Sequence, residues 1–332
     1  MSRNTQPLAM TMGDPAGVGI EVALRAWRAR RPEDAPFFLI AAPDVVSAAA
    51  RRLQIDAPVV ETDPAGAAAA IEKGVPVVRL ASPVSAEPGC PDPAGAAATV
   101  ESITRAVEAV RSGEARAVVT NPIAKSVLYK AGFRFPGHTE FLGELAGAWG
   151  RAAFPVMMIW SEALAVVPVT IHIPLCEAPK ALTSDLILRT ARIVDNDMRS
   201  RFGIAAPRLA LAGLNPHAGE GVAIGREEIE IIEPAIRTLR EEGIDAIGPL
   251  PADTMFHARA RARYDVALTM YHDQGLIPAK TLAFDDGVNV TLGLPFVRTS
   301  PDHGTAFDIA GKGVANPSSL IAALRLADRL TR

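Results

Sequence analysis

The chain has 332 residues, and at roughly 150 residues per domain this length predicts about two domains. Hydrophobic residues make up 49% of the sequence and charged residues 21%, a balance that provides for a large buried core and excludes an intrinsically disordered chain. The formal net charge of −3 gives no long-range attraction to nucleic acid or to an anionic membrane surface, so we expect neither as a partner.

The cysteine count and the N-terminal sequence predict a cytoplasmic location. Cys90 and Cys176 are the only cysteines, which is too few for a disulfide framework and fits a reducing compartment. The apolar stretch near the N-terminus is too short for the core of a signal peptide, and Gly and Pro interrupt it. No run approaches the roughly 20 apolar residues that a membrane span needs.

Short apolar runs alternate with longer amphipathic runs along the chain. The strand-like runs are Leu8–Met12, Phe37–Ala41, Val75–Leu80, Ala117–Thr120, Pro155–Ile159, Leu209–Ala212 and Val266–Met270. The helical runs are Val18–Arg30, Ala94–Arg111, Ser184–Arg201, Arg226–Glu242 and Ser318–Leu330. Strand followed by helix, repeated along the chain, is typical of an α/β fold with a largely parallel sheet. Because no flexible linker divides the chain, we expect discontinuous domains, with the chain crossing between them twice.

The tetrapeptide Asp-Pro-Ala-Gly occurs three times, beginning at Asp14, Asp63 and Asp92. Its irregular spacing excludes a structural repeat. At the second and third copies we expect the Asp to cap a helix and the Pro to occupy its first position. The Ala-rich stretch 63–70 is therefore predicted to be helical rather than a linker.

The first copy lies in the sequence MGDPAGVGIE, between a strand-like run and a helical run. Glycine in such a place lets the backbone approach a ligand, and the helix N-terminus favours an anion. Gly13 and Asp14 are therefore candidate cofactor contacts. The spacing is not GxGxxG, which excludes a Rossmann assignment, and a turn that requires glycine explains the pattern equally well.

Three of the six histidines follow strand-like runs: His172 after Ala165–Ile171, His217 in NPHAGE and His272 in YHDQG. Ligands of open α/β sheets bind at the carboxyl ends of the strands. Three imidazoles from separate strands could bind one divalent metal there and leave a position open for substrate. A single histidine is more often a hydrogen-bonded structural residue, so at this point both interpretations stay open.

Polar and cationic side chains form a second group of candidates. Lys280, Asn289 and Arg298 follow His272 in segments with few other charges, and His138 and Thr139 precede it. Cationic side chains beside a metal suit a phosphate or a carboxylate. Solvated surface positions are the usual alternative for Lys and Arg.

The C-terminal stretch HGTAFDIAGKGVANP contains His303, Asp308 and Asn316 in a glycine-rich loop before a helix. Such a loop could enclose a nucleotide, and an acidic side chain can accept hydrogen bonds from both ribose hydroxyls while rejecting a 2′-phosphate. From the pattern alone, Asp308 could instead cap a turn.

This stretch resembles the adenosine-binding loop of the isocitrate and isopropylmalate dehydrogenase superfamily. The whole chain resembles one family within it, the 4-hydroxythreonine-4-phosphate dehydrogenases of pyridoxal phosphate (vitamin B6) biosynthesis. The stretches that carry the resemblance span nearly the whole length in order: MTMGDPAGVGIE, TNPIAKSVLYKAGFRFPGHTEFLGELAG, NPHAGEGVAIGREE, GPLPADTMF and ALTMYHDQGLIPAKTLAFDDGVNVTLGLPFVRTSPDHGTAFDIAGKG.

The resemblance implies a two-domain fold with mostly parallel sheets and the active site in the cleft between the domains. A nucleotide-binding domain would span 1–130 and 290–332, and a metal, substrate and dimerisation domain would span 131–289. The implied metal ligands are His172, His217 and His272. The implied substrate contacts are His138, Thr139, Lys280, Asn289 and Arg298. The implied partner is a second copy of the chain, with each active site shared across the homodimer.

The resemblance also implies a reaction. NAD, or NADP, would take a hydride from C3 of 4-phosphooxy-L-threonine, and the 2-amino-3-oxo product would lose CO2 to give 3-amino-2-oxopropyl phosphate. One divalent metal per subunit, Zn, Mg or Co, would act on the C3 oxygen. Lys280 or Asp253 would relay the proton.

Two alternatives stay open. The first is a sister dehydrogenase of phosphothreonate, phosphoerythronate or a dihydrodiol acid. The second is a metal-dependent hydrolase or lyase, which would have no need of the Asp308 loop.

Overall fold

The computed structural model describes residues 6–84, 87–135, 137–150 and 153–332, and the chain forms two compact units. Unit 1 comprises residues 1–155 and 294–332, and unit 2 comprises residues 156–293. The chain thus passes from one unit to the other twice. The first passage lies after Pro155 rather than after residue 130, because the helix that begins at His138 packs against a helix of unit 1.

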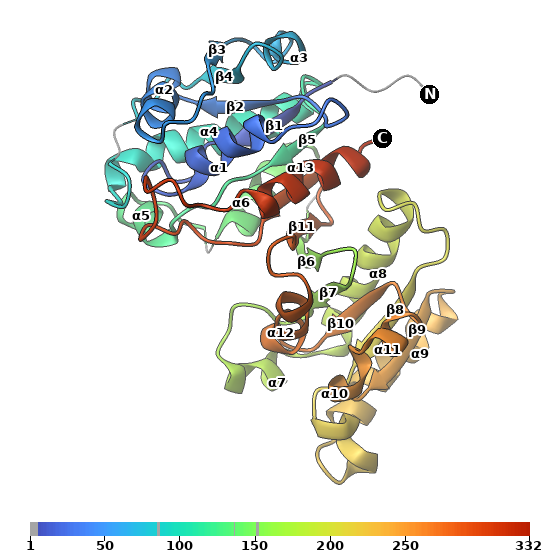
Figure 1. The fold of residues 1–332 in the computed structure, drawn as a ribbon. Coiled ribbons are helices and arrows are strands. Elements are labelled where there is room, and N and C mark those ends of the chain that lie inside the picture. Colours follow the sequence, from blue (N-terminus) through green and yellow to red (C-terminus); the bar gives the residue numbers. More distant parts are fainter. Residues whose placement is uncertain (1–5, 85–86, 136, 151–152) are drawn as a thin grey trace. The chain divides into compact units, whose positions relative to one another are not determined.

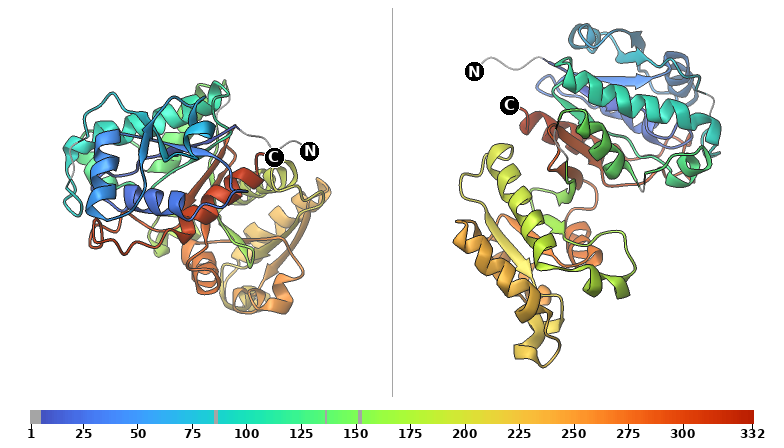
Figure 2. Two further views of the ribbon diagram at one scale, coloured as in Figure 1. Left: turned by 45° about the horizontal axis from the view of Figure 1, so that its top comes forward. Right: turned by 180° about the vertical axis from the view of Figure 1, so that it is seen from behind.

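Unit 1 is a parallel sheet with helices on both faces (Figure 1). Its strands, in sheet order, are β3 (Val59–Glu61), β4 (Val75–Arg79), β2 (Phe37–Ala41), β1 (Leu8–Thr11), β5 (Ala117–Val119) and β12 (Val297–Pro301). Its helices are α1 (Gly19–Arg28), α2 (Pro43–Arg52), α3 (Ala67–Ala70), α4 (Ala96–Arg111), α5 (Lys125–Lys130), α6 (His138–Gly147) and α13 (Ser318–Arg329). Helices α1, α2 and α13 cover one face, and α4 and α6 cover the other (Figures 1 and 2).

The strands of unit 1 explain why the sequence folds in this way. Every residue of β1, β2 and β5 is buried, as expected for a parallel sheet covered on both faces. The expected cap at Asp92 is present, since its side chain accepts a hydrogen bond from the backbone N–H of Ala94. The helix predicted over 63–70 begins only at Ala67, and Asp63 instead accepts a hydrogen bond from Gly66 N in the turn before it.

Unit 2 has a mixed sheet. Its strands, in sheet order, are β11 (Val288–Leu292), β6 (Val156–Trp160), β7 (Ala165–Pro168), β10 (Val266–Thr269), β8 (Arg208–Ala212) and β9 (Asp245–Leu250). Strand β6 runs antiparallel to both neighbours, and β7, β10, β8 and β9 are parallel. The helices are α7 (Ala178–Ala181), α8 (Ser184–Ser200), α9 (Glu233–Glu241), α10 (Ala252–Met255), α11 (Ala258–Arg261) and α12 (His272–Leu282).

The helices of unit 2 also lie on two faces of its sheet. Helices α8 and α9 pack together on one face, and α12 packs on β7 and β10 on the other (Figures 1 and 2). The predicted helical run Arg226–Glu242 is divided into a π-helical turn, Glu228–Ile232, and α9. No helix within the described ranges combines the length and apolar character that crossing a membrane requires.

Candidate functional site

The candidate metal centre lies at the carboxyl edge of the unit 2 sheet. Strands β7, β10 and β8 are adjacent and parallel, so their carboxyl ends meet at one edge. They end at Pro168, Thr269 and Ala212, and the predicted ligands that follow these ends are His172, His272 and His217. The topology thus brings the three loops together, as the strand pattern predicts.

Hydrogen bonds tie these loops to one another. Thr170 Oγ1 donates to the carbonyl of Met270 at 2.7 Å, which joins the β7 and β10 loops. Gln274 accepts from Met270 N at 2.7 Å and donates to the carbonyl of Gly213 at 2.7 Å, which joins the β10 and β8 loops. The edge is therefore a connected scaffold rather than three independent loops.

The imidazoles of His172 and His272 form a pair. Their ring centroids are 5.6 Å apart with an interplanar angle of 46°. Since each Zn–N bond is about 2.1 Å long, two ligating nitrogens can be no more than roughly 4.2 Å apart, which this ring spacing permits. His272 Nδ1 lies 2.7 Å from Asp273 Oδ1, a contact that orients the ring and leaves Nε2 for a metal. The donor chemistry therefore fits a divalent metal.

His217 is held separately. Its side chain is 62% exposed, and Nδ1 lies 3.9 Å from Asp253 Oδ2 at the start of α10. No group of three or more His, Cys, Asp or Glu side chains that could hold a metal occurs among the described residues of this single chain. That His217 completes the site therefore stays a prediction. The position of Asp253 suits a carboxylate that orients this imidazole.

Two further candidates belong to unit 2. Lys280 lies in the last turn of α12, two helical turns beyond His272, and is half-buried. Asn289 is half-buried in β11, where it is paired with Ile159 of β6.

The second candidate region is the carboxyl edge of unit 1, where β1, β5 and β12 are neighbours. Asp14 N donates to the carbonyl of Pro122 at 2.8 Å, and Val18 N donates to the carbonyl of Thr305 at 3.0 Å. Gly13 has a φ of +77°, and a Cβ there would lie 2.7 Å from the oxygen of Pro122. Glycine at this position lets the β1 and β5 loops pack tightly.

Asp14 serves this packing. Its side chain is 3% exposed, and Oδ1 accepts from Ala16 N at 3.0 Å, while the backbone of Ala124 donates a second hydrogen bond. Burial raises the pKa of this carboxyl. Asp14 is thus a buried, hydrogen-bonded part of this loop, and its role as a cofactor contact stays a prediction.

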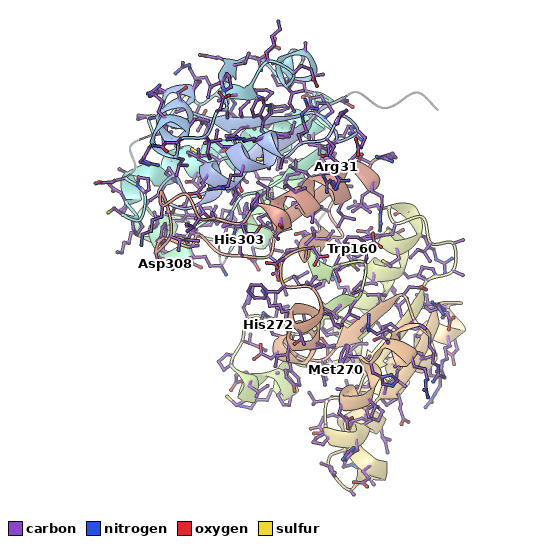
Figure 3. The ribbon with its side chains drawn as sticks, viewed as in Figure 1. Arg31, Trp160, Met270, His272, His303 and Asp308 are labelled. Atoms are coloured by element: carbon purple, nitrogen blue, oxygen red, sulfur yellow. The ribbon has the colours of Figure 1, made fainter. Side chains whose placement is uncertain are left out.

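The loop after β12 contains the three other predicted cofactor residues, His303, Asp308 and Asn316. Figure 3 labels the first two. His303 is half-buried, and its Nδ1 lies 3.0 Å from the carbonyl of Gly304. Asn316 Oδ1 accepts from the N–H and the hydroxyl of Ser318, the first residue of α13. Asp308 is exposed, and its side chain makes no hydrogen bond within the described part of the chain, so nothing there supports a turn-capping role.

Helix α1 holds the far end of this loop. Glu21, which is 3% exposed, accepts from Ala315 N at 2.9 Å, and Arg25 pairs with Glu21 and donates to the carbonyl of Gly313. With the Val18–Thr305 bond, both ends of the loop are fixed to the beginning of α1. The sequence indicated this loop but not the residues that hold it.

Unit 1 also contains a group of cationic side chains. Arg298 on β12 is 4% exposed, and its guanidinium donates to Thr120 Oγ1 from Nη2 at 2.6 Å and from Nε at 3.0 Å. Burial lowers its pKa to about 10, so it remains charged at neutral pH. A buried cation of this kind favours an anionic ligand.

His138 and Thr139 begin α6, and His138 lies close enough to Arg298 to feel its charge. The pKa of His138 is lowered well below its ordinary value of 6.5 by burial and by the charges of Arg298 and Lys125. Its buried Nε2 has no hydrogen-bond partner in the described part of the chain. A Cβ at Gly137 would lie 3.1 Å from Lys125 Nζ, which places this exposed lysine at the same helix end.

Lys125 was not among the sequence candidates. Exposed lysines have no distinguishing pattern, and only its place in the TNPIAKS stretch after β5 could have indicated it. Unit 1 therefore has a candidate site for a phosphate or carboxylate, made by Arg298, His138, Thr139 and Lys125. It lies at the N-terminus of α6, and helix N-termini favour such anions.

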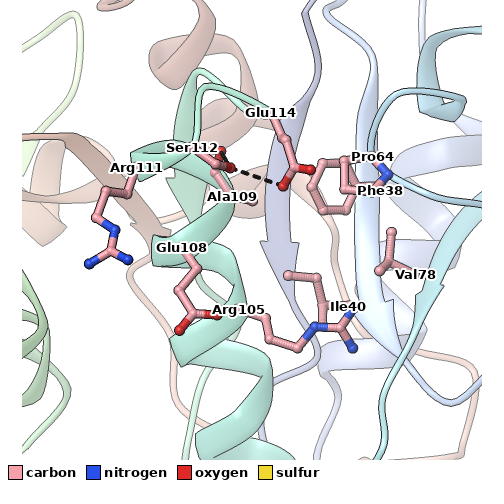
Figure 4. Close-up of a pocket in the computed structure, with 10 residues that line it drawn as sticks. All are labelled: Phe38, Ile40, Pro64, Val78, Arg105, Glu108, Ala109, Arg111, Ser112 and Glu114. Atoms are coloured by element: carbon pink, nitrogen blue, oxygen red, sulfur yellow. Dashed lines mark hydrogen bonds between the residues drawn. The ribbon is translucent and has the colours of Figure 1, made fainter.

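Two surface cavities of unit 1 contain none of these residues. One, of about 310 Å³, lies between α4 and strands β2 and β4, where Ser112 donates to Glu114 (Figure 4). The other, of about 470 Å³, is lined by residues from the segment 47–59 between α2 and β3. Neither offers the imidazoles or the buried cation of the two sheet edges.

An α/β chain with an imidazole pair on one sheet edge and a buried cationic group on another has the features of a metal-assisted enzyme for an anionic substrate. Comparison with known proteins defines the class further. Residues 33–327 match the family described as pyridoxal phosphate biosynthetic protein PdxA, and the chain belongs to this family.

Similar proteins cover the whole chain. A 4-hydroxythreonine-4-phosphate dehydrogenase of Methylorubrum populi is 62% identical over 100% of this chain and 96% of its own length. The crystal structure of the enzyme of that name from Klebsiella pneumoniae is 34% identical with a TM-score of 0.86, and the match covers 100% of this chain and 99% of that one. A terephthalate 1,2-cis-dihydrodiol dehydrogenase from Burkholderia xenovorans is 30% identical with a TM-score of 0.64, covering 98% of each chain.

Proposed function

We propose that the chain is an NAD-linked, metal-dependent 4-hydroxythreonine-4-phosphate dehydrogenase of vitamin B6 biosynthesis. The observation that carries the proposal is the imidazole pair of His172 and His272 at the edge of unit 2, in a chain that aligns over its whole length with dehydrogenases of this name. His217 is the proposed third ligand, and a homodimer that shares its sites is the proposed assembly.

The proposed reaction removes a hydride from C3 of 4-phosphooxy-L-threonine to NAD⁺ and a proton from the C3 hydroxyl. The product, 2-amino-3-oxo-4-phosphooxybutanoate, then loses CO2 and takes up a proton to give 3-amino-2-oxopropyl phosphate. A divalent metal bound by the imidazoles would supply Lewis-acid stabilisation of the negative charge on the C3 oxygen. The nicotinamide would supply the redox chemistry.

The protein side chains orient the substrate in this proposal. The proposed holders of an anionic group are Arg298, His138 and Thr139 of unit 1. Because His138 is neutral, it can donate one hydrogen bond without adding a positive charge to those of Arg298 and Lys125. We add Lys125 to this set because its ammonium lies at the same helix end. Lys280 and Asn289 of unit 2 are proposed as further substrate contacts.

The proton from the C3 hydroxyl would leave through Lys280 or Asp253. Of these, Asp253 stands beside His217 Nδ1, where it would also orient a metal ligand. Asp308 would accept hydrogen bonds from the adenosine ribose, since its carboxylate is exposed on the loop held by α1.

A substrate panel tests the proposal. Absorbance of the reduced cofactor is followed with NAD and NADP for 4-phosphooxy-L-threonine, its dephosphorylated analogue, phosphoerythronate and a terephthalate dihydrodiol. We expect turnover with 4-phosphooxy-L-threonine and NAD to exceed every other pair. Faster oxidation of the dihydrodiol would favour the activity named for the Burkholderia xenovorans protein. No quenching of NADH fluorescence on titration with the protein would favour a hydrolase or lyase instead.

A further inference from the structure

The segment that contains His217 has an unusual backbone. Six consecutive residues after β8, from His217 to Val222, have positive φ angles of 50°, 52°, 79°, 41°, 63° and 77°. Residues other than glycine avoid positive φ angles because their Cβ comes too close to a backbone carbonyl oxygen. Such a left-handed turn persists only where surrounding contacts hold it, and it is therefore the strained part of this edge.

Two neighbouring carboxylates make those contacts: Glu227 Oε2 accepts from Asn215 Nδ2 at 2.8 Å, and the buried Glu228 holds both the backbone and the side chain of Asn215. Glu228, in the π-helical turn before α9, is 2% exposed. Its Oε1 accepts from Asn215 N at 2.8 Å, and its Oε2 accepts from Asn215 Nδ2 at 3.0 Å. Asn215 stands two residues before His217, so these contacts fix the point where the left-handed turn begins.

The Glu228 carboxylate also contacts the middle of the turn. A Cβ at Gly219 would lie 2.7 Å from Glu228 Oε2, and a Cβ at Gly213 would lie 3.2 Å from Oε1. Glycine at both positions leaves the space that the carboxylate occupies. Glu228 is thus enclosed by backbone on both sides of His217, whereas the imidazole itself remains exposed and faces Asp253.

We propose that Glu228 is a positioning residue for His217: it holds the left-handed turn that presents the imidazole for metal binding. The proposal rests on the proposed role of His217 as a metal ligand. Groups that orient a metal ligand typically account for about 10- to 100-fold in metal affinity. Glu228 would act through backbone conformation rather than through a hydrogen bond to the imidazole.

The test is the affinity of the full-length protein for Zn²⁺ and Co²⁺, measured by calorimetry and by competition with a chelator. Glu228→Gln keeps the size of the side chain but puts an amide donor against an Asn215 donor, so we expect a loss of about 10-fold or more. Glu230→Gln is the matched control, because Glu230 lies in the same turn, is exposed and pairs with Arg226. We expect it to bind metal as the wild type does.

A second substitution separates positioning from general destabilisation. Ala218 has a φ of 52°, and glycine adopts such an angle without strain, so Ala218→Gly in the Glu228→Gln background should recover part of the metal affinity. Absence of recovery would contradict the proposal. If Glu228→Gln does not fold, Asn215→Ala replaces it, and an unchanged affinity in that variant overturns the idea.

His217→Ala distinguishes failure of this inference from failure of the proposed function. If His217→Ala loses metal affinity while Glu228→Gln matches Glu230→Gln, the positioning role is wrong and the metal role stands. If His217→Ala keeps full affinity, His217 is not a ligand and both ideas fail.

Discussion

The two units have the same kind of sheet edge but differ in how deeply the side chains at that edge are buried. In each, three adjacent parallel strands end side by side and their loops are tied by hydrogen bonds. The unit 1 edge is tightly packed, with Asp14 3% exposed and Arg298 4% exposed. The unit 2 edge is open, with the side chains of His217 and Asp253 62% and 58% exposed.

This difference matches what each edge is proposed to bind. A buried guanidinium is already removed from water, so its interaction with an anion is less screened and its geometry is fixed. A catalytic metal instead needs ligands that leave a coordination position open to substrate. The sheet places the functional side chains in both units, and we propose that the burial of these side chains decides which ligand they suit.

The largest expected effect is loss of the metal from the unit 2 edge. His272→Ala removes one member of the imidazole pair, so we expect bound metal and turnover to fall by about 100-fold or more. Elemental analysis of the purified protein measures the bound metal, and absorbance of the reduced cofactor measures turnover. His257→Ala is the control, because His257 is an exposed N-cap of α11 in the same unit. Wild-type activity that survives complete chelation would refute the metal role.

The contrast between the edges also shows what the sequence can predict. Apolar runs located β1, β2, β4, β5, β6, β8 and β10 to within a residue or two. Six of these are buried parallel strands, which are continuously hydrophobic, and the antiparallel β6 is apolar because four of its five residues are buried as well. Strands β3, β9, β11 and β12 lie outside the predicted runs. Strand β12 was missed because VRTSP is polar despite being wholly buried. The three histidine loops were predicted because strand ends locate them.

The residues that hold the loops were not predictable in this way. Glu228 lies in the amphipathic run Arg226–Glu242 and Glu21 in the run Val18–Arg30, where a carboxylate normally faces water. Both are buried, and each accepts a backbone N–H from a loop distant from its own helix turn. Only tertiary structure identifies such contacts, since nothing in local spacing marks them.

The second-largest expected effect is weaker binding of the phosphorylated substrate when Arg298, the buried cation of unit 1, is replaced. Arg298→Ala removes a charged hydrogen-bond donor, and at about 1.5–3 kcal/mol we expect KM for the phosphorylated substrate to rise roughly 10- to 150-fold. KM for NAD should change much less. Arg111→Ala, an exposed position on α4, serves as the control. If the dephosphorylated analogue reacts with wild-type enzyme as well as the phosphorylated substrate does, the assignment of an anion to this edge is wrong.

The third expected effect is a weaker preference for NAD over NADP when Asp308, in the loop after β12, is replaced. Asp308→Ser removes an exposed carboxylate that would repel the 2′-phosphate of NADP, so we expect lower efficiency with NAD and a narrower gap to NADP. The measurement is kcat/KM for both cofactors. The exposed Asp56, in the turn after α2, gives a matched control as Asp56→Ser. An unchanged ratio in Asp308→Ser would mean that selectivity arises elsewhere.

The smallest expected effect is a change in the titration of His138, measured by NMR of its imidazole with His138→Asn for assignment. Burial first, then Arg298 and Lys125, lower the pKa of His138. Lys125→Gln removes one of these charges, so the pKa should rise, whereas Lys130→Gln, at the other end of α5, should leave it unchanged. Because the folded pKa lies below the unfolded one, the neutral imidazole costs nothing above about pH 6.5, and the free energy of unfolding falls as pH drops below that value. His138→Asn should make the free energy of unfolding less dependent on pH in this range.

Inorganic phosphate bound between the cations should raise the pKa of His138, because its negative charge favours the imidazolium. A pKa that responds neither to Lys125→Gln nor to phosphate would show that burial and Arg298 keep His138 neutral without Lys125, and Lys125 would then have no part in the anion site.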